Sequence, residues 1–328
     1  MPTHDYSAIQ PKTRAFLEAL DAQGEPPIYT LSYREARSVL DRAQSEPVSK
    51  RAAEIEDAKV PGGPKGEISI RIVRPKASGE SRLPILMYFH GGGWVLGNKD
   101  THDRLIREIA DGAHAAVVFV NYTPSPETRY PTSIEEAYAA TRYLAESGES
   151  MGLDPSRLAV AGDSVGGNMV AAVTILAKQR GAPKIGHQLM FYPVTDASFD
   201  TGTYRQFANG PGLTRSAMKW FWNAYAPDPS TRNEPTASPL RATVDELRGL
   251  PPALLVTAEN DVLRDEGEAY AHKLTEAGVL VTSARYLGTV HDFMLLNAIT
   301  DDPAPRAAIA QAIAFLREAF AQNLPATE

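Results

Sequence analysis

Short apolar runs alternate with helix-patterned segments along most of this 328-residue chain. The runs have the length and composition of buried strands. They lie at residues 85–89, 115–120, 158–161, 189–192 and 253–257, with an alternating, half-buried strand before them at 68–73 and a further strand near 281–286 after them. Helical patterns occupy residues 101–112, 132–147, the Ala-rich stretch up to 180, 264–277 and a C-terminal stretch through Phe320. The alternation predicts an α/β fold with a mainly parallel central sheet and helices on both faces.

Two parts of the chain depart from this alternation. Residues 1–50 contain polar, helix-prone stretches in which Phe16, Leu17 and Leu20 recur at helical spacing. Residues 198–235 hold two of the three tryptophans among other bulky apolar side chains. We interpret both parts as a helical cap over the carboxyl edge of the sheet; an ordinary long crossover is the alternative for the second. The predicted division is an N-terminal cap part (1–50), a first core part (51–197), a cap insertion (198–235) and a second core part (236–328).

Two glycine-rich motifs follow predicted strands. Gly162-Asp163-Ser164-Val165-Gly166 lies between a strand and a helix, the context of a nucleophile elbow that exposes a serine hydroxyl. Upstream, His90-Gly91-Gly92-Gly93-Trp94 ends an apolar strand and fits a loop of bare amides that can bind an oxyanion. Glycine suits both places because the backbone turns sharply or approaches a substrate closely there. Together, in this order, the motifs indicate acyl transfer with Ser164 as nucleophile.

The neighbours of Ser164 suit that role. The amide of Val165, the residue after the serine, is an expected oxyanion donor. The helix that begins there favours negative charge at its N-terminus. We expect Asp163 to tie the elbow to its surroundings, and His90 to brace the glycine loop.

A serine hydroxyl needs an imidazole base. His291 lies in a loop directly after the last predicted strand, at the sheet edge where such a base must lie. His102 and His114 are expected at the surface or at helix ends. The other histidines have terminal, loop, strand or helix positions: His4, His90, His187 and His272. His291 is therefore the predicted base, with a loop histidine of no role as the alternative.

The base needs an acid to hold its tautomer. Asp261 follows the strand at 253–257 and gives the chain order Ser, Asp, His that an α/β-hydrolase has. Glu259 is the second choice. Asp265 and Glu266 are explained as charges in the first turn of a helix.

Composition excludes several classes of function. A formal net charge of −7 argues against nucleic acid or anionic lipid as the main partner. The sequence has no cysteine, which removes disulfides, thiolate catalysis and Cys-type zinc sites. We predict no metal and no cofactor. No apolar run reaches membrane-spanning length and the first residues lack a secretory pattern, so we expect a cytoplasmic protein without a stable membrane anchor.

The motifs resemble those of the hormone-sensitive-lipase family of α/β-hydrolases, in its bacterial esterase branch. The resemblance covers roughly residues 60–320. It rests on His90-Gly91-Gly92-Gly93-Trp94, Gly162-Asp163-Ser164-Val165-Gly166-Gly167-Asn168, Tyr192-Pro193-Val194-Thr195-Asp196 and Asp261-Val262-Leu263-Arg264-Asp265-Glu266. It implies an α/β-hydrolase fold in which the amides of Gly92 and Gly93 join that of Val165 in the oxyanion hole, while Gly91 shapes the loop.

Three positions depart from the family pattern. Val165 replaces the usual alanine, although only its N–H is needed. The segment 121–127 lacks the usual arginine, so it loses a structural brace. Asp292 stands where glycine is usual and places an extra carboxylate near His291.

These features predict a serine carboxylesterase for short- to medium-chain esters. Its partner is a small-molecule ester, with a homodimer left open. The predicted substrate pocket is lined by bulky apolar side chains of the cap and glycine loop: Trp94, Phe207, Leu213, Met218 and Trp222. The alternatives are an amidase or peptidase on the same triad, or a non-catalytic ligand-binding protein on a hydrolase fold.

Overall fold

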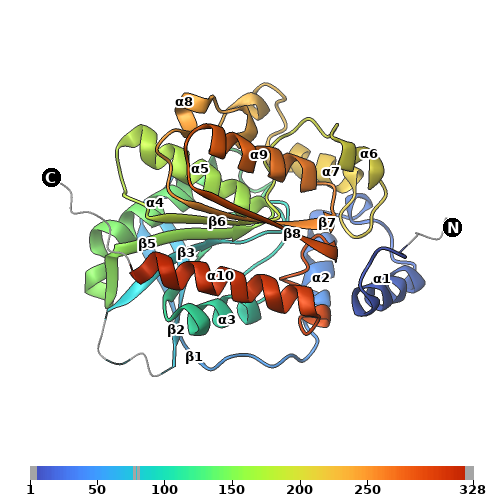
Figure 1. The fold of residues 1–328 in the computed structure, drawn as a ribbon, viewed down its shortest axis with the longest axis horizontal. Coiled ribbons are helices and arrows are strands. Elements are labelled where there is room, and N and C mark those ends of the chain that lie inside the picture. The colour runs from blue at the N-terminus through green and yellow to red at the C-terminus, as the bar shows by residue number, and fades with distance from the viewer. Residues whose placement is uncertain (1–5, 77–78, 80–81, 322–328) are drawn as a thin grey trace.

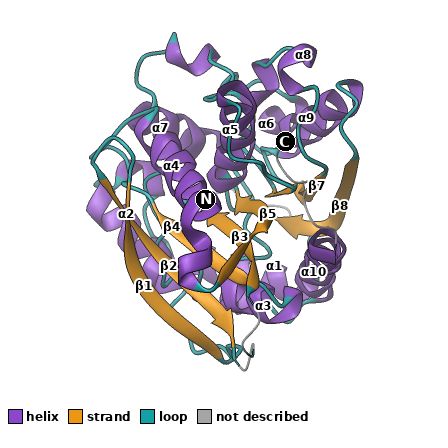
Figure 2. Ribbon diagram, turned by 90° about the vertical axis from the view of Figure 1, so that its left-hand side faces the viewer, coloured by secondary structure: helices purple, strands orange, loops and turns teal. Residues whose placement is uncertain are grey.

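The centre of the molecule is an eight-stranded sheet in the order β1-β2-β4-β3-β5-β6-β7-β8. The computed structural model describes residues 6–76, 79 and 82–321. The strands within them are β1 (Ala53–Pro61), β2 (Glu67–Pro75), β3 (Leu83–Phe89), β4 (Ala116–Asn121), β5 (Leu153–Asp163), β6 (His187–Phe191), β7 (Ala253–Asn260) and β8 (Val281–Val290). All pairs from β4 to β8 are parallel, whereas β1 and β2 are antiparallel additions. The predicted α/β fold with a mainly parallel sheet is confirmed, and Figure 2 shows the strands spread from β1 to β8.

Helices cover both faces of the sheet (Figure 1). On one face lie α4 (Thr132–Ser147), α5 (Val165–Arg180), α8 (Val244–Leu247) and α9 (Arg264–Glu276), and on the other α3 (Asp103–Ala113) and α10 (Pro303–Ala321). Successive strand side chains point to opposite faces, so one strand supplies both cores. Met87 and Phe89 of β3 belong to one apolar cluster, and Leu86 and Tyr88 to the other. The continuous apolar run of β3 is therefore what burial on two faces requires.

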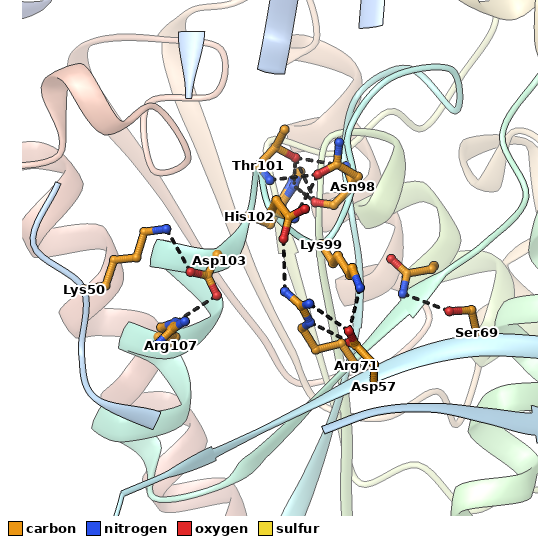
Figure 3. Close-up of polar contacts among 12 residues, drawn as sticks. Lys50, Asp57, Ser69, Arg71, Asn98, Lys99, Thr101, His102, Asp103 and Arg107 are labelled. Carbon is orange, nitrogen blue, oxygen red and sulfur yellow. Dashed lines mark hydrogen bonds and ion pairs between the residues drawn. The ribbon is translucent and has the colours of Figure 1, made fainter. Parts of the chain in front are cut away.

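The sequence pattern predicts no strand at β1, because most of its side chains are exposed and polar. Pairing with β2 holds this edge strand. Asp57 lies directly opposite Arg71 and accepts two hydrogen bonds from its guanidinium, at 2.7 and 2.9 Å. Lys99 contacts the same carboxylate at 2.6 Å (Figure 3). Polar cross-strand contacts, rather than an apolar alternation, thus mark β1.

The predicted cap parts, 1–50 and 198–235, contain α1 (Pro11–Gln23), α2 (Tyr33–Ala43), α6 (Gly202–Gln206) and α7 (Arg215–Tyr225). All four lie at the same end of the sheet (Figure 1). The ring of Tyr33 stacks on that of Trp220 with 4.8 Å between centroids, so the two parts touch each other. Residues 1–5, including His4, and 322–328 lie outside the described residues.

Helix α2 is attached to the core through Arg37. Its guanidinium donates to the carbonyls of Val95, at 2.8 Å, and Ser125, at 3.1 Å. It also forms a two-pronged ion pair with Glu127, at 2.6 and 2.8 Å. The segment 121–127, which lacks the arginine of the family pattern, thus receives a guanidinium from a distant part of the chain. In the part of the chain that the structure describes, none of the helices has the length and apolarity needed to traverse a bilayer.

Candidate active site

Ser164 lies in a strained turn between β5 and α5. Its backbone has φ 55° and ψ −119°, a conformation that a residue with a side chain rarely adopts. The turn is tight enough that a Cβ on Gly166 would overlap the carbonyl oxygen of Phe89. Backbone hydrogen bonds to Phe191, at 2.8 Å, and from Val194, at 3.1 Å, hold the serine in place. The strand-turn-helix context predicted for this motif is present, and it directs the hydroxyl out of the sheet edge.

Ser164, His291 and Asp261 form a chain of hydrogen bonds. The Nε2 atom of His291 is 2.9 Å from Ser164 Oγ, and its Nδ1 is 2.7 Å from Asp261 Oδ2. All three residues are buried, with 4, 6 and 1% of their surface exposed. They follow β5, β8 and β7, respectively. A neutral ring with its proton on Nδ1 satisfies both contacts, since Nδ1–H then donates to the carboxylate and Nε2 accepts from the hydroxyl.

The competing acids have other partners. Glu259 Oε2 accepts a hydrogen bond from the amide of Gly288 at 2.7 Å. Asp265 accepts from Thr203 and Glu266 from Thr195, again through backbone amides. Among the described residues, no group of three or more acidic or histidine side chains is arranged to hold a metal ion.

The glycine loop leaves amides free beside the serine. Gly92 and Gly93 have φ values of 103° and 64°, which L-residues with a side chain rarely adopt. The amide of Leu96 closes the loop by donating to the Gly92 carbonyl at 2.7 Å. No group of the described residues accepts a hydrogen bond from the amides of Gly92 or Gly93. The amide of Val165 is also a free donor, because the first N–H groups of a helix, here α5, have no acceptor within the helix.

His90 supports the loop from below. Its ring stacks on Tyr122 and Phe119, with centroid distances of 4.1 and 5.1 Å. The Nδ1–H group donates to the carbonyl of Gly91 at 2.8 Å, and the hydroxyl of Tyr122 donates to the carbonyl of His90 at 3.0 Å. Burial, with the neighbouring His102, lowers the pKa of His90 to about 3. The ring is therefore a neutral packing element at physiological pH.

Asp163 lies directly beneath Gly91 and joins the elbow to the loop. Its carboxylate accepts a hydrogen bond from the hydroxyl of Tyr88 at 2.8 Å and lies 3.3 Å from Nε2 of His102. Of the two expected positions of His102, the surface or a helix end, the structure has the helix end, where the ring is fully buried. Thr101 holds the other side of that ring at 2.9 Å (Figure 3). The sequence shows only a histidine before a helix, which gives no signal of this partner.

Asp292 places a second carboxylate near the base. Its Oδ1 atom lies 3.5 Å from Nε2 of His291 and is buried. Burial alone would lower the pKa of His291, but the negative charges of Asp261, Asp292 and, more weakly, Asp163 outweigh it and raise the pKa to about 9. Burial also raises the pKa of Asp292, in spite of the nearby imidazole.

An apolar cavity of about 350 Å³ opens above the serine. Ser164, His291, Asp292 and the two glycines Gly92 and Gly93 form its floor. Leu213 and Met218 of the insertion line it. The wall opposite comes from the N-terminal helices and their connection, whose lining the sequence analysis did not identify: Phe16, Leu17, Leu20, Ile28, Tyr29 and Leu40.

Three side chains predicted for the pocket lie elsewhere. Trp94 is fully buried, with its ring stacked on Tyr225 at 3.9 Å and against the edge of Trp222 at 4.9 Å. These rings form a core beneath the insertion, because large aromatic surfaces pack against one another as readily as against a ligand. Phe207 faces the guanidinium of Arg264, 5.9 Å away. In their place Phe221, which packs directly over Gly93, reaches the cavity.

Comparison with known proteins finds esterases similar to this chain in sequence and in fold. Carboxylesterase NlhH of Mycobacterium tuberculosis is 38% identical over 87% of this chain and 89% of its own length. The ethyl acetate hydrolase of Pseudomonas putida is 35% identical over 90% of this chain and 95% of its own. The crystal structure of a thermostable esterase from Pseudomonas putida superposes with a TM-score of 0.94, at 50% identity, over 95% of this chain and 98% of that one.

A family model described as the alpha/beta hydrolase fold matches residues 86–295, which include both glycine motifs and His291. Strand order, elbow, glycine loop and relatives therefore lead to one assignment: the chain belongs to the α/β-hydrolase fold family, in its hormone-sensitive-lipase-like esterase branch.

Proposed function

We propose that the protein hydrolyses carboxylic esters with short to medium acyl chains through an acyl-enzyme on Ser164. His291 is the general base, Asp261 holds and stabilises it, and the amides of Gly92, Gly93 and Val165 bind the oxyanion. The observation that carries the proposal is the hydrogen-bonded chain from Asp261 through His291 to Ser164, which ends at the floor of an apolar cavity.

Ester hydrolysis as such follows from the family. The relatives and structural neighbours are carboxylesterases and esterases, so the protein is a carboxylic-ester hydrolase. Beyond this activity, we propose the catalytic residues, the path of the proton and the preference for acyl length.

Acylation begins with attack of Ser164 Oγ on the ester carbonyl carbon, while His291 Nε2 takes the hydroxyl proton. The carbonyl oxygen becomes an oxyanion, to which the free amides of the glycine loop and of Val165 donate. When the carbon–alkoxy bond breaks, the imidazolium returns its proton to the departing alcohol. Asp261 stabilises the imidazolium at each stage without accepting its proton.

Deacylation repeats this sequence with water. The water oxygen attacks the acyl carbon and gives one proton to Nε2 of His291. Collapse of the second oxyanion breaks the bond to Ser164 Oγ, which takes the proton back, and a carboxylic acid leaves. The enzyme is regenerated with no change of oxidation state and no requirement for a further reactant.

The cavity favours esters of modest size. Its volume of about 350 Å³ is at the small end of the range for ligand pockets. Its walls are mostly apolar side chains, which bind an acyl chain by removing it from water. We propose that α1, α2 and α7 act together as the cap that forms these walls.

Replacing the nucleophile tests the mechanism. Ser164→Ala should lower kcat for para-nitrophenyl acetate by about 10⁴- to 10⁶-fold, since a triad member typically contributes that much. The thermal midpoint should change little. Ser150→Ala, at an exposed serine, is the matched control and should keep wild-type turnover. A Ser164→Ala protein that retains turnover within about tenfold of wild type would contradict the proposal.

Replacing the acid distinguishes Asp261 from its closest competitor. Asp261→Asn should cost about 10⁴-fold in kcat, because the amide favours the wrong imidazole tautomer. Glu259→Gln keeps an oxygen that accepts from the Gly288 amide, and should change kcat by less than about threefold. Steady-state kinetics on the two variants decides the assignment. A crippled Glu259→Gln beside an active Asp261→Asn would reverse it.

Cavity and core positions should respond differently to alanine. Leu213→Ala and Met218→Ala enlarge the cavity and should raise kcat/KM for octanoate relative to acetate esters by about tenfold, since each methylene in an apolar pocket contributes about 1–3 kcal/mol. Trp222→Ala instead removes a fully buried core ring and should lower the free energy of unfolding by about 3–5 kcal/mol. Its chain-length profile should stay unchanged. A profile that moves only in Trp222→Ala would relocate the acyl site.

The pH dependence should reflect the raised pKa of His291. The base acts only when neutral, so activity is lost as pH falls through this pKa, and the acid limb of kcat/KM should lie above pH ~6.5, the ordinary histidine value. Asp292→Asn removes one of the charges that raise the pKa and should move the limb down by about 1 pH unit. Asp261, Asp163 and the ring of Tyr192 remain around the base in this variant. A limb that does not move would show that Asp292 does not contribute to the raised pKa of His291.

A further inference from the structure

Asp292 has a buried oxygen that the triad does not use. Its Oδ1 atom, which no described group hydrogen-bonds, lies 3.5 Å from Nε2 of His291. Asp292 also lines the cavity together with Ser164. A carboxylate oxygen that stays unpaired in a buried site is costly, so a partner that arrives during the reaction is the natural explanation.

Deacylation supplies such a partner. In the acyl-enzyme, Ser164 Oγ is esterified and no longer donates to His291. The attacking water takes its place and donates one hydrogen to Nε2. Its second hydrogen needs an acceptor in a cavity whose walls are mostly apolar.

The two acceptors are spaced for one water. A water oxygen about 2.8 Å from both Nε2 and Oδ1, which are 3.5 Å apart, would see them at an angle of about 77°. Each O–H bond would then point about 14° away from its acceptor, which leaves nearly linear hydrogen bonds. A lone pair remains on the side away from both acceptors, free to attack the acyl carbon.

The backbone holds Asp292 in this position. The residue has φ 63°, a left-handed conformation that glycine or a short polar residue adopts. Its carbonyl accepts hydrogen bonds from the amides of Leu295, at 2.8 Å, and Leu296, at 3.0 Å. The turn that carries the carboxylate is thus fixed independently of His291.

We propose that Asp292 positions the deacylating water, by accepting a hydrogen bond from it while His291 accepts the other. The inference rests on the proposed acyl-enzyme mechanism. It assigns Asp292 to the second half-reaction and to the choice of acyl acceptor, a role separate from its charge effect on the base.

Methanol distinguishes this role from a structural one. Water has two O–H hydrogens and can donate to both acceptors. Methanol has a single O–H hydrogen, and that one must be donated to His291. Asp292 therefore assists water but not methanol. The ratio of methanolysis to hydrolysis reports on this difference, and because both products arise from the same acyl-enzyme, the ratio does not depend on the rate of acylation.

The experiment measures that ratio with para-nitrophenyl acetate in buffered methanol-water mixtures, on the alkaline plateau where the base is neutral in every variant. Asp292→Gly, which suits the left-handed backbone, should raise the ratio of methyl acetate to acetate by about fivefold or more through loss of the acceptor. Asp292→Asn loses the charge but keeps an acceptor oxygen, so its ratio should stay within about twofold of wild type. Thermal midpoints identify any variant that fails to fold.

Each outcome decides the matter. A high ratio in Asp292→Gly with a wild-type ratio in Asp292→Asn supports water positioning. An unchanged ratio in folded Asp292→Gly overturns it while leaving the triad proposal intact. An equal rise in both variants assigns the effect to charge and also overturns it. Failure of the wild type to form an acyl-enzyme on Ser164, by mass spectrometry of the quenched reaction, overturns the mechanism and this inference together.

Discussion

The parallel pairing of β5, β6, β7 and β8 is the constraint on which the site depends. Asn260 and Val290 are register partners on β7 and β8, so the next residues along each strand, Asp261 and His291, leave the sheet as neighbours. Asp163 is likewise opposite Phe191, so Ser164 leaves β5 beside Tyr192, whose ring is 5.0 Å from that of His291. A register error of one residue would turn each side chain to the other face. The two apolar cores enforce the register, and thereby the spacing of groups far apart in the chain.

A second requirement is that the glycine loop and the elbow stay fixed relative to each other. Glycine lowers the stability of both, since it gains most freedom on unfolding. Buried polar groups beneath the loop and the elbow offset this loss of stability. These groups are Asp163, beneath Gly91, and the neutral ring of His90, between its aromatic neighbours. Such a network stabilises only when its members are paired, so one lost hydroxyl, such as that of Tyr88, would leave one oxygen of the buried Asp163 carboxylate without its partner.

Much of this could be predicted from sequence, for identifiable physical reasons. Strands buried on two faces are unbroken apolar runs, and Ser164 and Asp261 each follow one of them, whereas His291 follows the largely exposed edge strand β8. The exposed strand β1 carries no such run. Aromatic side chains were harder to place, because Trp94 and Trp222 look the same in sequence whether they line a pocket or a core. The partner of His102 and the direction of the Asp292 side chain depend on tertiary packing, which no local pattern encodes.

The attachment of α2 has a consequence for how the two halves of the site relate. Arg37 binds the carbonyl of Val95, which follows the glycine loop directly, and α2 also supplies Leu40 to the cavity wall. The cavity wall formed by α2 and the glycine loop are therefore held together through Arg37. Deleting the N-terminal helices would therefore have two effects at once. It would open the cavity, and it would remove the Arg37 hydrogen bond that holds the backbone next to the glycine loop. Substrate range and catalytic power in this scaffold are bound to change together.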